Sequence, residues 1–555
     1  MTAPGIHGTV SPAWHSLGPE DDAPDGTLRR VEVEGRAVCL GRVARQWVAF
    51  DDTCTHQECA LSGGELDGAI VVCPCHGSEF DVRTGDVLSP PALDPLPIYE
   101  VRVEAGALEV RFAPPAAAAQ AAAERAEQAG PPVAGPDLGD LDLDEIDLTD
   151  LDRWVEGVPY DWFALLRRAA PLHWQDEQEG SGFWSFTRYD DIVAVSKDYE
   201  SYSSETGGTS LQDLTPEELE LRKSMIDTDP PRHTRLRAIV NQGFTPKVLN
   251  AYEERIRGLA RTILQNALQR ERFDWVADVA SEIPMWVFSE IMGLPVEDRR
   301  LLIDLGDKLL GNTDPEVMGE AAVADVALHD PELRKLPFSS PYAVDLMAYG
   351  SRLGEARRQE PRDDITTKLV QAEVEGGRLS PREFETFFIL LTTAGNETTR
   401  HTLSLGLQAL FEHPDERARL LADPSLTATA ADEILRWAHP VHHFRRTATR
   451  RVEAHGRTIE AGDKVALWYA SGNFDEQRFP DPYRFDVSRA PNRHLTFGLG
   501  GPHFCLGAHL AKLEVRIWLD EMLPYLDRIE PAGPPDRLRS NFFNGIKRLP
   551  VRVTA

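Results

Sequence analysis

Residues 113–136, APPAAAAQAAAERAEQAGPPVAGP, constrain the fold most, because a run of this composition cannot bury a core. Ala, Pro and Gly in such numbers are typical of a linker, here with room for one short helix. The next segment, residues 137–157, carries nine acidic residues against Arg153 and predicts a solvated lead-in. A chain of 555 residues also exceeds what one hydrophobic core supports. We therefore expect a multidomain protein, with domains at 11–112 and 147–555 and a linker at 113–146.

The N-terminal domain has the pattern of a small all-β domain. The runs RAVCLGRVARQWVAF and YEVRVEAGALEVRF are short and rich in Val and aromatic residues, as strands are. Ala105 and Gly106 divide the second run and predict a hairpin turn there.

The C-terminal domain is expected to be mainly α-helical with a minor β region. Its clearest helix begins after Ser380, a good N-cap, with Pro381 at the first helical position and Glu383 closing a capping box. Pro414 ends it, which gives a helix of about thirty residues, or about 45 Å. A helix so long and apolar must cross the middle of a large domain, yet its centre reads AGNETT, where Gly395 costs about 1 kcal/mol relative to Ala. Local rules are broken in this way mainly at functional sites, and Gly with Thr is also where helices kink.

Two segments of the β domain, CTHQEC at 54–59 and CPCHGS at 73–78, each place a cysteine close to a histidine. Structural zinc also accepts two Cys and two His, but its usual spacing groups the cysteines together and the histidines together. A c-type haem needs C-x-x-C-H, and CPCH is one residue short of it. Two loops that each offer a thiolate and an imidazole instead favour a two-iron cluster, with the cysteines on one iron and the histidines on the other.

On these motifs the domain at 11–112 resembles the Rieske [2Fe–2S] proteins. The C-x-H and C-x-x-H pairs have the order and separation of that family. The resemblance implies a [2Fe–2S] cofactor and four metal ligands, which are Cys54, His56, Cys73 and His76.

Further residues of these loops match the branch that is similar to the Rieske proteins of respiratory bc complexes. That likeness implies a disulfide between Cys59 and Cys75, with two free buried thiols as the alternative, and a hydrogen bond from Ser78 to a cluster sulfur. The tyrosine of that branch is Phe80 here, so one such bond is missing. Cys39 lies outside the pattern and is expected to be a small core residue.

A lone cysteine near the C-terminus, Cys505, lies in HLTFGLGGPHFCLGAHLAKLE at 494–514. The glycines around it allow close backbone approach to a flat ligand. The segment after it predicts a helix, so the thiol lies at a helix N-terminus, where its pKa is lowered and the thiolate is favoured. A cysteine thiolate on haem iron favours O–O cleavage.

Four motifs in the right order resemble the cytochromes P-450 over residues 147–550. These are DPPRHTRLR (229–237), AGNETT (394–399), the individually weak E-x-x-R in EILR (433–436), and FGLGGPHFCLG (497–507). The last has one extra residue between Phe497 and Cys505. Some bacterial sterol and methyl-branched lipid hydroxylases of the family share that insertion, together with AGNETTR, HFRRTA and ASGNFDE.

The resemblance implies a haem b with Cys505 as its metal ligand. Its expected cofactor-binding residues are His233, Arg237, Arg446, His503, Phe497 and Gly507. It also implies a structural ion pair of Glu433 with Arg436. His443 and Phe444 are weaker candidates for the substrate pocket.

Three residues of AGNETT are expected to act in catalysis. Dioxygen activation needs protons, so a carboxylate and a hydroxyl on successive residues, Glu397 and Thr398, predict a proton relay. Gly395 is expected to open the groove where dioxygen lies.

The two halves together predict a monooxygenase (EC 1.14 class) that hydroxylates an apolar small molecule, preferably a sterol or lipid, with O2. A fused cluster raises the effective concentration of the electron donor at the haem and passes electrons one at a time. No G-x-G-x-x-G opens a βαβ unit in the sequence, so we expect an external, flavin-containing ferredoxin reductase that uses NAD(P)H.

The net charge of −31 argues against nucleic acid and anionic membrane surfaces as partners. The sequence contains no long apolar run and no signal-peptide pattern, so we expect no membrane span and a cytoplasmic location. Three rival functions remain: a redox sensor or electron carrier without turnover, a peroxide-driven haem enzyme, and a Rieske-type non-haem oxygenase. The last needs an iron site of two His and a carboxylate, for which no convincing segment is present.

Overall fold

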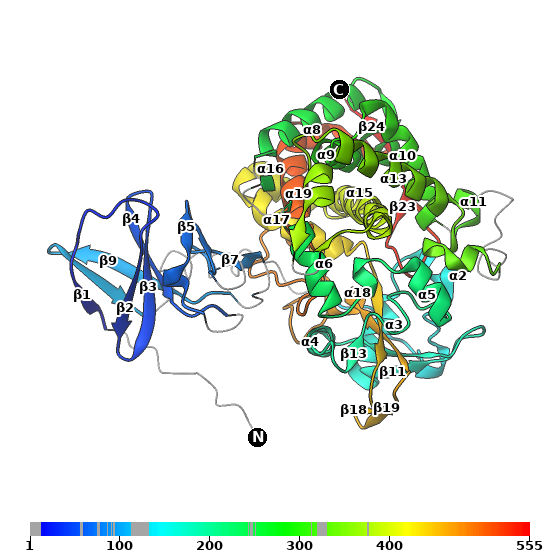
Figure 1. The fold of residues 1–555 in the computed structure, drawn as a ribbon, viewed down its shortest axis with the longest axis horizontal. Helices are drawn as coiled ribbons and strands as arrows, with labels where there is room; N and C mark the ends of the chain where they lie inside the picture. The colour runs from blue at the N-terminus through cyan, green and yellow to red at the C-terminus, as the bar shows by residue number, and fades with distance from the viewer. Residues whose placement is uncertain are drawn as a thin grey trace. The chain divides into compact units, whose positions relative to one another are not determined.

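The computed structural model describes residues 13–55, 59–74, 78–85, 87–89, 92, 95–112, 133–241, 243–244, 248–249, 251–311, 313–318, 330–374 and 377–554. The chain divides into two compact units, residues 1–131 and residues 132–555 (Figure 1).

The N-terminal unit is built from two antiparallel sheets. The larger has the order β1-β10-β9-β4-β3-β2, formed by β1 (His15–Pro19), β2 (Leu28–Val33), β3 (Arg36–Val43), β4 (Gln46–Asp51), β9 (Ile98–Glu104) and β10 (Ala107–Arg111). The smaller has the order β5-β6-β7-β8, formed by β5 (Glu65–Asp67), β6 (Ile70–Val72), β7 (Glu79–Asp81) and β8 (Val87–Ser89).

The hairpin predicted at Ala105 and Gly106 is confirmed. Both residues have positive φ, 51° and 78°, as a two-residue turn between twisted strands requires. Successive side chains of a strand point to opposite sides of the sheet, and a hydrophobic cluster covers each side of β3. Leu40 packs into one cluster, whereas Cys39 packs into the other with Phe80. Cys39 is therefore the core residue that was expected.

The C-terminal unit is mainly helical (Figure 1). Its described α-helices are α2 (Leu151–Glu156), α3 (Tyr160–Ala169), α4 (Tyr189–Lys197), α5 (Pro216–Arg222), α6 (Arg232–Asn241), α8 (Glu253–Ala267), α9 (Glu282–Met292), α10 (Arg299–Leu310), α11 (Pro315–Met318), α13 (Tyr342–Gln359), α14 (Ile365–Gln371), α15 (Pro381–Glu412), α16 (Pro414–Ala422), α17 (Thr427–Ala438), α18 (Tyr469–Gly472) and α19 (Ala508–Met522). None of the helices in the described ranges is both long and apolar enough to span a bilayer.

Small sheets complete the unit, which confirms the minor β region that was expected. Five strands have the order β11-β12-β20-β17-β13, formed by β11 (Leu172–Gln175), β12 (Phe183–Phe186), β13 (Tyr202–Ser203), β17 (His443–Ala448) and β20 (Lys464–Trp468). Three more have the order β14-β24-β21, with β14 (Arg272–Asp274), β21 (Ile529–Pro531) and β24 (Pro550–Val553). The two-stranded pairs are β15 (Glu373–Val374) with β16 (Gly377–Arg378), β18 (Val452–Ala454) with β19 (Arg457–Ile459), and β22 (Asp536–Arg537) with β23 (Ile546–Arg548).

Helix α15 runs through the middle of this unit (Figure 1). Its predicted capping box is present: the Ser380 hydroxyl accepts from the Glu383 amide at 3.2 Å, and the Glu383 carboxylate accepts from the Ser380 amide at 2.9 Å. The helix has 32 residues and continues without interruption through AGNETT. There the Thr398 hydroxyl donates to the carbonyl of Ala394 at 2.7 Å, so this hydroxyl is satisfied within the helix.

The acidic segment before α2 differs from the solvated lead-in that was expected. Ile146 and Leu148 are buried, and three further leucines pack against the same core cluster, Leu138, Leu141 and Leu143. Most carboxylates of the segment face solvent, and two of them cap short helices at Asp142 and Asp150. Because leucines alternate with the acids, one side of the segment binds the C-terminal unit while the other carries the charge. Residues 133–146 therefore belong to this unit and not to the linker.

Candidate functional site

The loop before α19 positions Cys505. Its amide donates to the carbonyl of Phe497 at 2.9 Å, which folds the loop back on itself. The thiol has accessible surface although it lies deep inside the unit, where burial raises its pKa. The backbone amide of Gly507 and the charge of Arg237 act in the opposite direction and favour the thiolate. The thiol is therefore accessible to a ligand although protein surrounds it.

The extra residue of this loop is accommodated by glycine. Gly500 and Gly501 have φ of 100° and 75°, which other residues rarely adopt. A Cβ on Gly501 would lie 1.9 Å from the carbonyl oxygen of Ser196 in α4. The loop backbone therefore packs directly on the end of that helix, at a position where only glycine fits.

Four cationic or basic residues gather beside Cys505. His233 and Arg237 come from α6, Arg446 from β17 and His503 from the loop, and the two imidazole rings lie 4.3 Å apart. Burial lowers the pKa of each of the four, and the pKa of His233 falls to about 4 because both arginines add to the effect.

These groups fit a dianionic ligand. Within the described part of the chain, neither Arg237 nor Arg446 forms an ion pair with a carboxylate, although both are desolvated. One ring nitrogen each of His233 and His503 is buried without a hydrogen-bond partner among the described residues. Buried charges and donors are unfavourable unless they are paired. The two propionates of a haem would satisfy them, with the Cys505 thiolate on the iron.

The middle of α15 offers a second accessible surface. Ala394 and Gly395 are exposed although most of the surrounding helix is buried, and a Cβ built on Gly395 meets nothing within 4 Å. Thr398 lies one turn further on the same face and is half-buried. A flat ligand held by Cys505 can therefore have open space on its other side, bounded by a hydroxyl.

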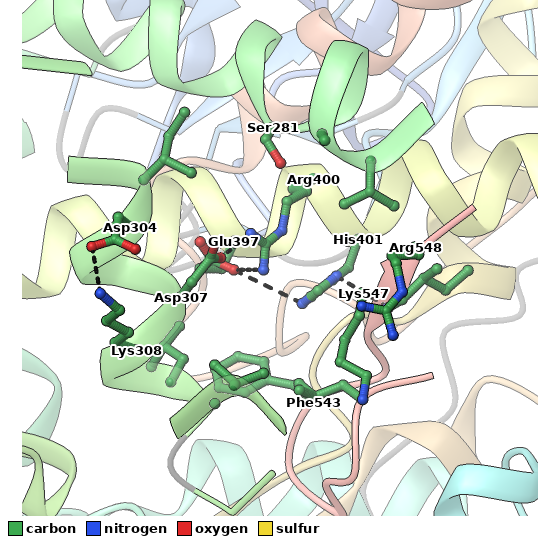
Figure 2. A pocket seen from close by; sticks show the side chains of 18 of the residues that line it. Ser281, Asp304, Asp307, Lys308, Glu397, Arg400, His401, Phe543, Lys547 and Arg548 are labelled. Atoms are coloured by element: carbon green, nitrogen blue, oxygen red, sulfur yellow. Dashed lines mark hydrogen bonds and ion pairs between the residues drawn. The ribbon is translucent and has the colours of Figure 1, made fainter. Parts of the chain in front are cut away.

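Glu397 lies on another face of α15 and is buried (Figure 2). Its carboxylate accepts from the side-chain amide of Asn396 at 3.1 Å and forms an ion pair with Arg400. Arg400 also pairs with Asp307 of α10. Burial raises the pKa of Glu397, Arg400 lowers it and Asp307 raises it further. The AGNETT motif predicts Glu397 but not its partners. Arg400 could have been found from its i+3 spacing, whereas Asp307 comes from a different helix.

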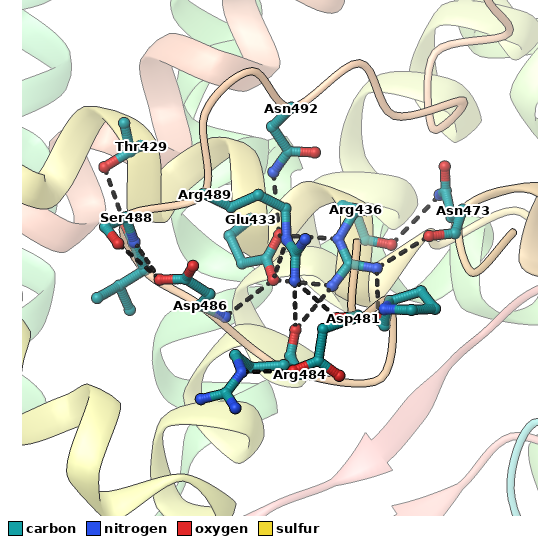
Figure 3. A network of polar contacts seen from close by, with 12 residues as sticks. Thr429, Glu433, Arg436, Asn473, Asp481, Arg484, Asp486, Ser488, Arg489 and Asn492 are labelled. Carbon is teal, nitrogen blue, oxygen red and sulfur yellow. Dashed lines mark hydrogen bonds and ion pairs between the residues drawn. The ribbon is translucent and has the colours of Figure 1, made fainter. Parts of the chain in front are cut away.

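Glu433 and Arg436 form a fully buried ion pair with both contacts at 2.8 Å (Figure 3). A second guanidinium, Arg489, reaches both oxygens of Glu433 at 3.1–3.2 Å, and Asn492 donates to it at 3.0 Å. Arg436 also donates to the carbonyl of Asn473 at 2.9 Å. The network fixes the chain before the cysteine loop onto α17. Sequence motifs did not indicate Arg489 or Asn492.

The two weak candidates for the substrate pocket differ in their surroundings. His443 is 1 % exposed, with its ring 4.5 Å from that of Trp468 and 5.4 Å from that of Phe542, so its place in the substrate pocket stays a prediction. Successive side chains of a strand alternate, so His443 and Phe444 face opposite sides of β17. Phe444 is half-buried and remains a candidate.

In the N-terminal unit, the described parts of the two predicted ligand loops close in the same way. The Cys54 amide donates to the Cys59 carbonyl at 2.8 Å, and the Cys73 amide donates to the Ser78 carbonyl at 2.7 Å. Cys54 and Cys73 are buried and not in disulfides, whereas Cys59 is disulfide-bonded. Two buried thiols kept reduced beside an oxidised cysteine fit metal ligands.

The remaining predicted residues, His56, Cys75 and His76, lie outside the described residues, so the cluster ligation and the Cys59–Cys75 pairing stay predictions. The hydroxyl of Ser78 is buried and accepts from the Ala92 amide at 2.8 Å, which leaves its proton available to an acceptor. Phe80 is buried in the core.

Comparisons with known proteins agree with both halves of the chain. The family model described as Rieske [2Fe-2S] domain matches residues 13–100, and that described as Cytochrome P450 matches residues 348–538. A Mycobacterium tuberculosis protein named methyl-branched lipid omega-hydroxylase is 41% identical over 70% of this chain and 90% of its own length. A Rhodococcus jostii steroid C26-monooxygenase is 36% identical over 72% of this chain and 83% of its own length.

Solved structures give the same result. A Mycobacterium marinum cytochrome P-450 in complex with pseudoionone superposes with a TM-score of 0.67 at 37% identity, over 74% of this chain and 98% of that one. A Bacillus megaterium cytochrome P-450 in complex with testosterone gives 0.64 at 30% identity, over 73% of this chain and all of that one, 100%. The chain therefore belongs to the cytochrome P-450 family of haem-thiolate monooxygenases and carries a Rieske [2Fe–2S] domain in front of its P-450 fold.

Proposed function

We propose that the chain hydroxylates an apolar lipid or sterol-like molecule with O2, and that its Rieske cluster passes electrons singly to the haem. The observation that carries the proposal is the accessible Cys505 thiol beside four basic residues that have no carboxylate partner in the described ranges. That set fits a haem, and the same chain supplies a donor domain.

In this proposal the chain's own residues hold the haem and manage protons. Cys505 binds the iron, and the residues that bind the propionates are His233, Arg237, Arg446 and His503. The haem, when bound, supplies the O–O cleavage that a thiolate ligand favours. Thr398 presents a hydroxyl at the accessible face of α15, Gly395 leaves room above it, and Glu397 holds a proton one residue away.

The substrate class is supported by the relatives and by a cavity near α15. The relatives are named for methyl-branched lipids and steroids. A cavity of about 100 Å³ has one group of apolar side chains in its lining, Leu214, Leu219, Ile226, Pro337, Phe338, Ile389 and Leu390, together with polar and charged residues such as Arg222 and Asp227. Small-molecule sites combine apolar side chains with a few polar groups, so the apolar part of this cavity suits part of a lipid or sterol.

The electron supply is proposed to come from a separate flavin-containing reductase that uses NAD(P)H. The two family matches account for an iron–sulfur and a haem domain, and the sequence has no dinucleotide fingerprint. The cytoplasmic location expected from the sequence stays a prediction.

One set of measurements tests this function. The purified full chain should show a thiolate-type ferrous–CO Soret band and a Rieske EPR signal. With a ferredoxin reductase, NADPH and 18O2, it should insert one labelled oxygen atom into a sterol or a methyl-branched fatty acid. Cys505→Ala should remove the Soret band and turnover, while Cys39→Ala, at a core thiol of the other unit, should keep both. Both signals without oxygen insertion would instead support a redox sensor.

A further inference from the structure

A cavity of about 360 Å³ lies between α10, α15 and β23, and of the residues in the four P-450 motifs only Glu397 lines it (Figure 2). Its outer lining includes exposed residues such as Asp304, Glu316 and Arg548. Its buried lining includes three ionisable residues, Glu397, Arg400 and His401. The cavity therefore extends from charged residues at the surface to Glu397, the acid that precedes Thr398.

One guanidinium at the inner end serves two carboxylates. One terminal nitrogen of Arg400 pairs with Asp307 and the other with Glu397. Asp307 comes from α10 and is partly exposed, whereas Glu397 comes from α15 and is buried. A Cβ on Gly306 of α10 would lie 3.4 Å from the nearer oxygen of Glu397, so the two helices meet closely at this carboxylate.

His401 does not supply a second cation. Its Nδ1 accepts from the Ile546 amide at 3.4 Å, so its proton lies on Nε2, which is 3.9 Å from the Glu397 carboxylate. Burial lowers the pKa of His401 well below its usual value, and Arg400 adds to the effect. The imidazole is therefore neutral and contributes no charge to balance Glu397.

The other cations of the cavity pair with carboxylates other than Asp307 and Glu397. Lys308 binds Asp304 at 2.7 Å, Lys547 binds Glu316 at 2.6 Å, and the remaining cations pair in the same manner, Arg300 with Glu282 and Arg548 with Asp536. The inner site thus holds two carboxylates for one cation. A single proton would remove the excess negative charge, in agreement with the direction of the Glu397 pKa.

We propose that Asp307 and Glu397 together hold one proton and that Arg400 positions the two carboxylates. The water of this cavity supplies the proton. The inference rests on the proposed function and names Asp307 as a further positioning residue for it. In the protonation step an O–H bond of a hydronium ion breaks, one forms on a carboxylate oxygen, water is left and no electron moves. Protonation weakens the hold of Arg400 on Glu397, whose side chain is then free to carry the proton toward Thr398.

An infrared titration of the full-length protein tests the pair without turnover. The C=O band of a protonated carboxyl that is lost in Glu397→Gln reports the Glu397 proton as the pH is varied. Asp307→Asn should lower the midpoint of this band by about one pH unit or more, because a neighbouring negative charge is removed. Asp304→Asn is the matched control, since it removes a carboxylate from the same helix and cavity that does not pair with Arg400, and should shift the midpoint less.

Turnover supplies the second readout. Asp307→Asn should slow product formation about tenfold or more and raise the solvent isotope effect, as loss of a proton donor does. Asp307→Glu should restore most of the rate, which also excludes misfolding as the cause. Equal midpoints and isotope effects in Asp307→Asn and Asp304→Asn would overturn the pair. A chain with no hydroxylase activity would overturn the proposed function instead, and the infrared titration would still report on the pair.

Discussion

Glu433 binds more partners than the E-x-x-R motif alone predicts. Its two oxygens accept from Arg436, Arg489, Asn492 and the Asp486 amide, and it is fully buried. Two guanidinium groups in the core are tolerable only because this carboxylate and several carbonyls surround them. The network (Figure 3) thereby fixes residues 484–492 onto α17, just ahead of the cysteine loop.

Replacing Glu433 by Gln should destabilise the C-terminal unit by about 3–5 kcal/mol, because two buried guanidinium groups lose their counter-charge. Chemical denaturation followed by tryptophan fluorescence measures the change. Glu453→Gln makes the same chemical change in the exposed pair with Arg451 and should leave the midpoint unchanged. A Glu433→Gln midpoint equal to that of Glu453→Gln would show that the network is dispensable.

At the scale of elements, the acidic lead-in shows how charge and burial coexist in one short segment. Like-charge runs usually mark solvated chain, and the carboxylates here do face solvent. Leu148 is nevertheless fully buried, its amide donates to Gln175 at 3.0 Å, and its carbonyl accepts from Trp154 and Asn541. The segment is therefore an integral edge of the C-terminal unit.

Leu148→Ala should destabilise this unit by about 2–5 kcal/mol, the usual range for a buried leucine that leaves a cavity. Thermal unfolding of the full chain, followed at the haem Soret band, measures the loss. Val155→Ala removes apolar atoms from an exposed position of α2 and should cost less than about 1 kcal/mol. If both variants melt like the parent, burial of Leu148 does not contribute to the stability of this unit.

Helix α15 has some features that the sequence predicts and others that only the tertiary structure shows. Its start and its end follow from Ser380, Pro381 and Pro414, because capping and proline act locally. AGNETT was recognisable because Gly and polar residues are unfavourable in a core. Asp307 carried no such signal, since an ordinary acid on an amphipathic helix becomes informative only when packing sets it opposite Arg400. Local rules gave the helix and its motif, whereas the tertiary partners needed the structure.

At the scale of the whole molecule, sequence motifs identify the two domains but do not predict whether the domains act together. Spacing of Cys and His identified the Rieske domain, and four motifs identified the P-450 fold. Whether electrons pass within one chain depends on potentials and geometry that no motif encodes. Rieske centres span about −150 to +300 mV, and the upper part of that range would make haem reduction unfavourable unless substrate or a haem ligand shifts it.

Electron transfer within one chain should be directly visible in the full-length protein. After photoreduction under CO with a bound methyl-branched fatty acid, the Rieske EPR signal should decay as the ferrous–CO band grows. The rate should stay the same on about tenfold dilution, because a tethered donor reacts at an effective concentration set by its linker. Cys73→Ala should lack the signal and the transfer, whereas Cys39→Ala should retain both. A rate that falls in proportion to protein concentration would assign the transfer to separate molecules, and a cluster that is never reoxidised would remove it from the electron path.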